Sequence, residues 1–184
     1  RHYLTFADEI VIYDDRSNDG SREILKRFNI DIIDAPFNGL NDLAFMEIWS
    51  HELANSVGKC DWIMFPDIDE LLYAPEGMKE TLEKLGNTYG IIDSHAYNMV
   101  GDGLPEYDGL QLYEIITNGV RSPVYSKAIV LKPGTRVNWH LGRHQITDCS
   151  APVSLPVLKL LHFRYLGYNY TKERNARNYE RVGH

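Results

Sequence analysis

The sequence predicts an α/β fold in which a mostly parallel, twisted sheet is flanked by helices. Short apolar runs that favour strands alternate with stretches whose apolar residues recur at helical spacing. Acidic segments follow two of the apolar runs directly, and ligands of open α/β sheets bind at that end of the strands. The length, 184 residues, is that of one domain, so we expect residues 1–184 to form a single domain.

The first elements have the order strand, helix, strand. Apolar, β-rich runs at 9–13 and 30–34 predict two strands, and the apolar spacing over 21–28 predicts an amphipathic helix between them. Ser21 is the expected N-cap of that helix. Two strands joined through a helix favour parallel pairing with a right-handed crossover.

The later elements follow from the same two periodicities. We expect helices over 41–56, 76–85 and 171–181, and strands over 62–65, 90–96, 126–131 and 159–165. The chain starts at Arg1, without Met, a few residues before the first predicted strand. We therefore expect a piece of a longer chain, in which an earlier strand of the sheet precedes Arg1.

Composition excludes several classes of function. The formal net charge of -7 disfavours nucleic-acid binding through a general basic surface, because such proteins neutralise phosphates with clustered Lys and Arg. No apolar run approaches the roughly 20 residues of a transmembrane helix. Cys60 and Cys149 stand outside any zinc or CxxC spacing and are expected to be buried free thiols. We therefore expect a cytoplasmic location, with attachment to a membrane surface through other parts of the chain left open.

Two carboxylates follow the strand predicted at 62–65. Asp67 and Asp69 stand two residues apart in the segment Phe-Pro-Asp-Ile-Asp-Glu. In a turn, such carboxylates can converge on one hard divalent cation such as Mn²⁺ or Mg²⁺. Acids after strands also form turns and cap helices, so the triplet alone leaves both interpretations open.

A second acidic segment follows the first predicted strand. Residues 14–21 read Asp-Asp-Arg-Ser-Asn-Asp-Gly-Ser. Their carboxylates and hydroxyls can accept hydrogen bonds from a nucleobase or a ribose, and Gly20 permits a tight turn into the following helix. The alternative is an Asx-rich turn that only begins the helix.

Taken together, the two segments resemble the family 2-like glycosyltransferases of the GT-A fold. The resemblance covers most of the chain. It implies a nucleotide-diphosphate sugar donor, commonly a UDP-sugar, a divalent metal, and an acceptor hydroxyl on a glycan, a lipid or a protein. Inversion is the tendency of the family. No Gln-x-x-Arg-Trp motif is present, which favours transfer of a single sugar over processive synthesis.

The resemblance also implies individual roles. The implied donor site comprises Asp14, Asp15, Ser17, Asp19 and Asp67, and the implied metal ligands are Asp67, Asp69 and His162. Asp15 matches the acid that contacts the nucleobase. His162 matches a late histidine that many GT-A enzymes supply to the metal, and imidazole suits Mn²⁺-like ions. A histidine satisfied within a core strand is the alternative.

The catalytic base is the least determined part of the site. An inverting transferase needs a carboxylate or a histidine that deprotonates the acceptor hydroxyl. Asp102 and Glu106, in an acidic Gly-rich loop, are the first candidates, and Asp148 is the third. Loop solubility is the alternative for each of them, and turn-forming preferences of Asp and Gly favour it. His140 and His144 form a further polar cluster that could line the acceptor side or be incidental.

Basic residues near the C-terminus complete the expected site, and two other functions remain open. One of Arg164, Lys172, Arg174 and Arg177 could balance the charge of the leaving diphosphate. One alternative is a metal-dependent nucleotidyltransferase, although the sequence has no Gly-rich phosphate loop. The other is a catalytically inactive binding module of the same fold.

Overall fold

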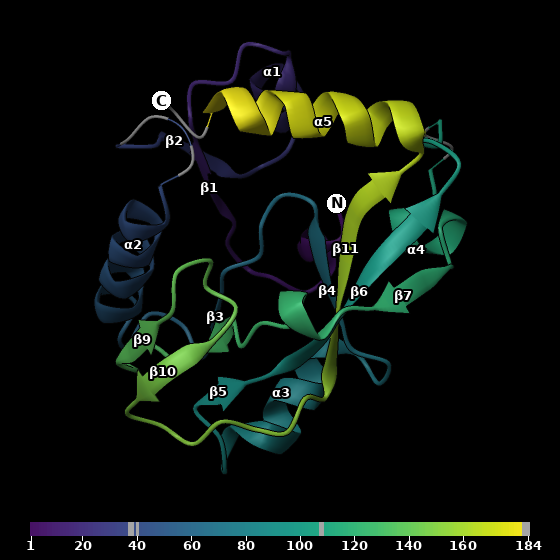
Figure 1. Ribbon diagram of the computed structural model, residues 1–184. Coiled ribbons are helices and arrows are strands. Elements are labelled where there is room, and N and C mark those ends of the chain that lie inside the picture. The colour runs from purple at the N-terminus through teal and green to yellow at the C-terminus, as the bar shows by residue number, and fades with distance from the viewer. Residues whose placement is uncertain (37–38, 40, 107–108, 182–184) are drawn as a thin grey trace.

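The computed structural model in Figure 1 describes residues 1–36, 39, 41–106 and 109–181. Within these residues the fold is mixed α/β, as the sequence predicts. The helices are α1 (Ser21–Leu25), α2 (Asp42–Asn55), α3 (Met78–Gly86), α4 (Leu112–Ile115) and α5 (Tyr168–Arg181), with two 3-10 turns at Tyr3–Thr5 and Pro123–Tyr125. The strands are β1 (Val11–Asp14), β2 (Asp31–Asp34), β3 (Ile63–Met64), β4 (Glu70–Tyr73), β5 (Ile91–Ile92), β6 (Ser94–Gly101), β7 (Gly119–Arg121), β8 (Val130–Leu131), β9 (Val137–Trp139), β10 (Ile146–Cys149) and β11 (Leu158–Leu166).

The strands form several small sheets instead of the one mostly parallel sheet that we expected. Among the described residues the sheet orders are β1-β2, β9-β10, β3-β8-β5 and β4-β11-β6-β7. Only β1 with β2 and β6 with β11 pair in parallel, and the other pairs are antiparallel. Antiparallel neighbours need no helical crossover, so short strands late in the chain can pair without one.

The opening strand, helix and strand form in the predicted order, but the helix expected over 21–28 ends at Leu25. β1 and β2 pair in parallel, from Val11 with Asp31 to Asp14 with Asp34. The expected cap was wrong, because Gly20 is the N-cap of α1, at φ 87°, and its place suits a residue without a Cβ. The Ser21 hydroxyl instead donates to Asp19 Oδ1 at 2.6 Å.

The later strands begin and end at residues other than those expected from the sequence, where the chain turns towards other segments. The strand expected at 90–96 is divided into β5 and β6, and β6 continues to Gly101. The strand expected at 126–131 is reduced to β8, because the preceding residues cross β6, where Ser94 Oγ donates to the Lys127 carbonyl. β4, β7, β9 and β10 were not expected. All four are short; β4 and β7 pair with residues far away in the sequence, and β9 and β10 pair with each other.

The main hydrophobic core lies between the β3-β8-β5 sheet and two helices. Its buried residues include Trp49 and Leu53 of α2, Met78 and Leu82 of α3, and Ile91, Ile92, Val130 and Leu131 of the sheet. A second cluster covers β11 and β6 near α4. The Trp49 ring stacks on Phe65 at 4.7 Å, which fixes α2 against the segment that follows β3.

Two further expectations concern cysteines and membranes. Cys60 is exposed and Cys149 is half-buried, and both are free, so the expected burial of Cys60 was wrong. Within the described part of the chain, no helix has the length and apolar character that crossing a membrane requires.

Candidate functional site

The two carboxylates of the Asp-x-Asp segment lie on a tight loop between β3 and β4. Glu70 N donates to Asp67 O at 2.9 Å, and Asp67 N donates to Glu70 Oε2 at 3.0 Å, so the loop closes on itself. At its start, Phe65 N continues the ladder to Ile129 O at 3.0 Å. In Figure 1 this loop rises beneath α5, beside β11. Hydrogen bonds within this segment therefore fold it into a loop on which its acidic residues lie close together.

A row of polar side chains crosses the β4-β11-β6 sheet next to this loop. His162 of β11 is in register with Glu70 of β4 and with Asn98 of β6. Side chains at such paired positions stand on the same face of a sheet. His162 Nδ1 lies 3.1 Å from Asn98 Oδ1, and its Nε2 lies 2.9 Å from Asp69 Oδ2. The strand register, more than the loop, therefore sets the position of His162.

The orientation of the His162 ring follows from its neighbours. Nδ1 lies within hydrogen-bond distance of Asn98 Oδ1, at 3.1 Å, and Nε2 lies on the side of Asp69. Metal-binding histidines are oriented in the same manner, by a carbonyl or carboxylate on the second nitrogen.

Asp69 has a cation on its other side as well. Arg174 of α5 places Nη2 2.6 Å from Asp69 Oδ2. This buried oxygen is within ion-pair distance of both His162 and Arg174, yet neither approaches along a hydrogen-bond direction. Burial alone would raise the pKa of Asp69, but His162 and Arg174 lower it below its ordinary value. The carboxylate is therefore charged at neutral pH.

Asp67 is held by a different set of cations. Lys127 Nζ lies 2.7 Å from Asp67 Oδ2 and 2.6 Å from Glu70 Oε1. Burial opposes the charge of Asp67, but Lys127 and then Arg143 lower its pKa. Burial and the charge of Asp67 raise the pKa of Glu70, and the two acids together keep the pKa of Lys127 high. The result is an acid–lysine–acid cluster in which Lys127 and Glu70 are buried and Asp67 is partly exposed.

Arg143 joins this cluster to α2. Its guanidinium lies over the rings of Phe45 and Trp49, at 4.6 and 4.9 Å, and 3.4 Å from Asp67 Oδ1. It is also 3.6 Å from Asp42 Oδ1, near the start of α2. The backbone of Arg143 has φ 59°, in the left-handed region that residues with a Cβ rarely adopt. Strained backbone of this kind clusters at functional sites.

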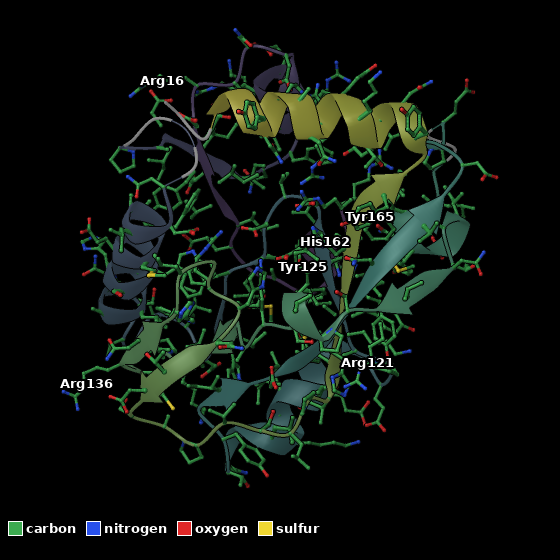
Figure 2. The ribbon with its side chains drawn as sticks, in the orientation of Figure 1. Arg16, Arg121, Tyr125, Arg136, His162 and Tyr165 are labelled. Atoms are coloured by element: carbon green, nitrogen blue, oxygen red, sulfur yellow. The ribbon has the colours of Figure 1, made fainter. Side chains whose placement is uncertain are left out.

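Aromatic rings connect His162 to a neighbouring cavity. The Tyr125 ring lies 5.1 Å from that of His162 and 5.4 Å from that of His144, and Figure 2 shows Tyr125, His162 and Tyr165 together near the middle of the fold. Burial, and then the charge of Lys127, lower the pKa of His144 to about 4. His144 is therefore neutral at neutral pH, and it lines a cavity of about 630 Å³.

The segment at 14–21 lies at the carboxyl end of β1 and is partly used by the fold itself. The buried Asp14 Oδ2 accepts from Ser17 N and from Arg22 Nη1, both at 3.0 Å. Asp15 Oδ2 accepts from Gly39 N at 2.8 Å. Ser17 and Asp19 are exposed. The turn interpretation therefore accounts for Asp14 and for Asp19, whose Oδ1 accepts from Ser21 N and Oγ, and the side chain of Ser17 is exposed.

Helix α5 relates the two acidic segments. Arg174 pairs with Asp69, whereas Arg177 adds to the hydrogen bonds of Ser21 in lowering the pKa of Asp19. Residues three apart lie on one side of a helix, so α5 presents two arginines towards the two segments. The separate acidic loops that the sequence predicts are thus next to the same helix face.

The three candidate bases lie in two different places. Asp102 and Glu106 are exposed and follow the end of β6. Asp102 lies beside Gly167, at the far end of β11 from His162, which is about 13 Å along the strand from Leu166. Asp148 lies on β10 and lines the same cavity as His144. Only Asp148 therefore shares a cavity with a residue of the site.

The donor set fits a divalent cation in part. Asp69 and His162 lie together, with Nε2 2.9 Å from Asp69 Oδ2, and a carboxylate and an imidazole are suitable ligands for a Mn²⁺-like ion. Asp67 is turned to Lys127 instead. In the described ranges no group of three or more His, Cys, Asp or Glu side chains is arranged to hold a metal. Two of the three expected ligands are thus brought together.

Four residues of the site were not identified from the sequence: Asn98, Tyr125, Lys127 and Arg143. A signal existed for one of them, because Lys127 is the lone charge before the apolar run at 128–131, and a buried lysine needs acidic partners. The other three are polar or aromatic residues in irregular segments or alternating strands. Their roles depend on contacts with residues far away in the sequence.

Comparison with known proteins adds nothing to this geometry. A scan against protein-family models and a search of curated proteins both found no match for the chain.

Proposed function

We propose that the chain is a metal-dependent glycosyltransferase domain of the family 2-like GT-A type, which moves a single sugar from a UDP-sugar to an acceptor hydroxyl. The observation that supports it is the meeting of Asp69, His162 and Arg174 at one point. A carboxylate and an imidazole suit a Mn²⁺-like cation, and a guanidinium beside them suits the oxygens of a diphosphate.

Each group has a definite task in this proposal. Asp69 and His162 would hold Mn²⁺ or Mg²⁺, with Asp67 adjacent in the loop, and the bound ion supplies Lewis-acid stabilisation of the leaving nucleotide. Arg174 exchanges the carboxylate of Asp69 for a phosphate oxygen when the donor binds. Asp15, at the end of β1, receives the nucleobase.

The buried Lys127 acts on the shape of the site. It holds the side chains of Asp67 and Glu70 at 2.7 and 2.6 Å, so the loop between β3 and β4 is kept in one conformation before any donor arrives. A site that is fixed in advance loses less free energy on binding. Lys127 also offsets part of the negative charge that would repel a diphosphate.

A second candidate is a binding module of the same fold that needs no metal. It is favoured by the cations that already pair with both acids, Lys127 and Arg143 with Asp67, and Arg174 with Asp69. In that function Arg174 would contact the diphosphate directly, and Lys127 and Arg143 would contribute positive charge from behind the loop.

Calorimetric titration of UDP, with and without Mn²⁺, distinguishes the two. The glycosyltransferase proposal expects Mn²⁺ to strengthen UDP binding about tenfold or more in the native chain, and expects Asp69→Asn to abolish that gain. Asp61→Asn, at an exposed acid before β3, is the matched control and should behave as the native chain. Binding that is equal with and without Mn²⁺ supports the binding module. No heat in either condition, from protein whose circular dichroism shows it to be folded, overturns the UDP assignment.

A further inference from the structure

The cavity next to His144 has a composition of its own. It has a volume of about 630 Å³, within the roughly 300–1,000 Å³ of ordinary ligand pockets. Its lining includes His144, Gln145 and Asp148, and also Asp93, between β5 and β6. These lining residues therefore come from β10 with the residues before it and from the segment between β5 and β6, and they include His144 of the candidate site.

The charges of the cavity wall are all negative. Asp93 and Asp148 are among its lining residues, and none of those lining residues is Lys or Arg. Asp93 Oδ1 accepts from Ser94 N at 2.8 Å, which fixes this carboxylate in the wall. His144 adds no positive charge at neutral pH, because its pKa is lowered to about 4 by burial first and Lys127 second. A phosphate or carboxylate placed here would be repelled.

The remaining wall suits a molecule with polar edges and apolar faces. Gln145 and Thr147 offer an amide and a hydroxyl, and Ile146 and Val153 offer apolar surface. Carboxylates that only accept hydrogen bonds are matched by hydroxyl donors. A sugar ring has hydroxyls at its edge and C–H groups on its faces, so it would contact both the polar and the apolar residues of the wall.

We infer that this cavity binds the acceptor, and that the acceptor presents a sugar unit without a phosphate or other anionic group. The inference rests on the proposed function, since it needs a transfer reaction at the neighbouring acids. The Tyr125 ring lies 5.1 Å from that of His162 and 5.4 Å from that of His144, so the cavity is one aromatic ring away from the Asp69–His162 pair. An acceptor hydroxyl would have to reach the donor sugar past the edge of Tyr125.

Amide ¹H–¹⁵N spectra of the folded chain test the inference, with UDP and Mn²⁺ present. The probes are the methyl glycosides of glucose, galactose and mannose, with glucose 6-phosphate as the anionic counterpart. We expect at least one methyl glycoside to shift the amides of 145–149, and glucose 6-phosphate to bind about tenfold more weakly. The double variant Asp93→Asn/Asp148→Asn should weaken glycoside binding and make the affinities for the glycoside and for glucose 6-phosphate similar. Glu83→Gln, at an exposed acid on α3, is the control and should leave both unchanged.

The outcomes separate this inference from the proposed function, because UDP binding is measured on the same samples. If UDP binds and no methyl glycoside shifts the cavity amides, the cavity assignment is overturned and the donor site stands. If UDP does not bind but glycoside shifts are confined to 145–149, the cavity is a sugar site and the proposed function fails. Glucose 6-phosphate binding as tightly as the glycosides overturns the exclusion of anionic acceptors.

Discussion

The ammonium group of Lys127 lies 2.6 Å from Glu70 Oε1, and the two side chains are only 2% and 1% exposed. Removing one partner of a buried pair leaves an uncompensated charge, which costs about 3–5 kcal/mol. Lys127→Met should therefore lower the free energy of unfolding by about that amount in urea denaturation followed by circular dichroism. Adding Glu70→Gln should restore most of the loss, because a neutral amide needs no counter-charge. A single-variant loss below about 1 kcal/mol would show that water reaches this pair.

Arg174 is predicted to recognise the diphosphate and not the nucleoside. Arg174→Ala should weaken UDP binding about tenfold, since a charge-assisted contact to phosphate is lost, and should leave uridine binding unchanged. Calorimetry with both compounds measures the difference. Lys172→Ala, at an exposed position on the same helix, is the matched control. Equal losses for UDP and uridine would mean that Arg174 only supports the position of α5.

His162 is predicted to be required for the metal itself. Mn²⁺ broadens the NMR signals of nearby nuclei, so the amides near Asp69 and Asn98 should broaden selectively in the native chain. His162→Ala should weaken the apparent affinity for Mn²⁺, measured from this broadening, about tenfold, because one of the two proposed ligands is removed. His51→Ala, at an exposed histidine of α2, should leave it intact. Broadening that persists in His162→Ala would assign the ion to other residues.

The lowered pKa of His144 predicts a pH dependence of stability. The unfolded chain binds a proton on this residue near pH 6.5, whereas the folded chain does so near pH 4. Between these values the unfolded state holds more protons, so stability falls as pH falls through the window and is fully present above it. His144→Gln should flatten that part of the curve in urea titrations between about pH 7 and pH 4.

Other groups titrate in or near the same pH window, so the contribution of His144 is the difference between the pH profiles of the native chain and of His144→Gln. Burial lowers the pKa of His2, which adds a slope of the same sign. The raised pKa of Glu70 gives the opposite sign above pH 4.5, and the lowered pKa of Asp69 acts only below pH 3.8. A pH profile of His144→Gln that parallels the native one would contradict the assignment.

Gly167 is predicted to tolerate no side chain. It has φ +83°, and a Cβ built on it would lie 2.5 Å from Asp102 O. Gly167→Ala should therefore lower stability by about 1–3 kcal/mol or more in thermal unfolding. Gly103→Ala is the matched control, because nothing lies within 4 Å of its Cβ position. Similar melting temperatures for the two variants would show that the end of β11 shifts freely.

Local sequence patterns account for one part of the fold. The parallel pairing of β1 and β2 follows from a strand, a helix and a strand in succession, and the strand expected at 159–165 is present as β11. In contrast, β4 exists because Glu70 to Tyr73 pairs with residues 159–162. A four-residue strand defined by a partner so far away has no periodicity by which to recognise it.

The candidate site divides in the same way. The expectation that Asp69 and His162 belong together came from a resemblance, and the two lie 2.9 Å apart, whereas their metal stays a prediction. Lys127 and Arg143 could not be predicted as partners of Asp67, because each reaches it by tertiary packing from a loop. Local sequence patterns therefore do not identify the cationic partners that decide whether a carboxylate is free to bind a ligand.

The independence of the two-stranded β1-β2 sheet has a consequence for engineering. Its ladder includes neither β4 nor β11, and the distance between Asp69 and His162 is set by the ladder of those two strands. The loop at 15–20 can therefore be exchanged without altering the strand pairing that positions Asp69 and His162, and on the proposed function such an exchange would change nucleotide preference. A replacement loop would have to preserve the interaction of Asp19 with Arg177 of α5.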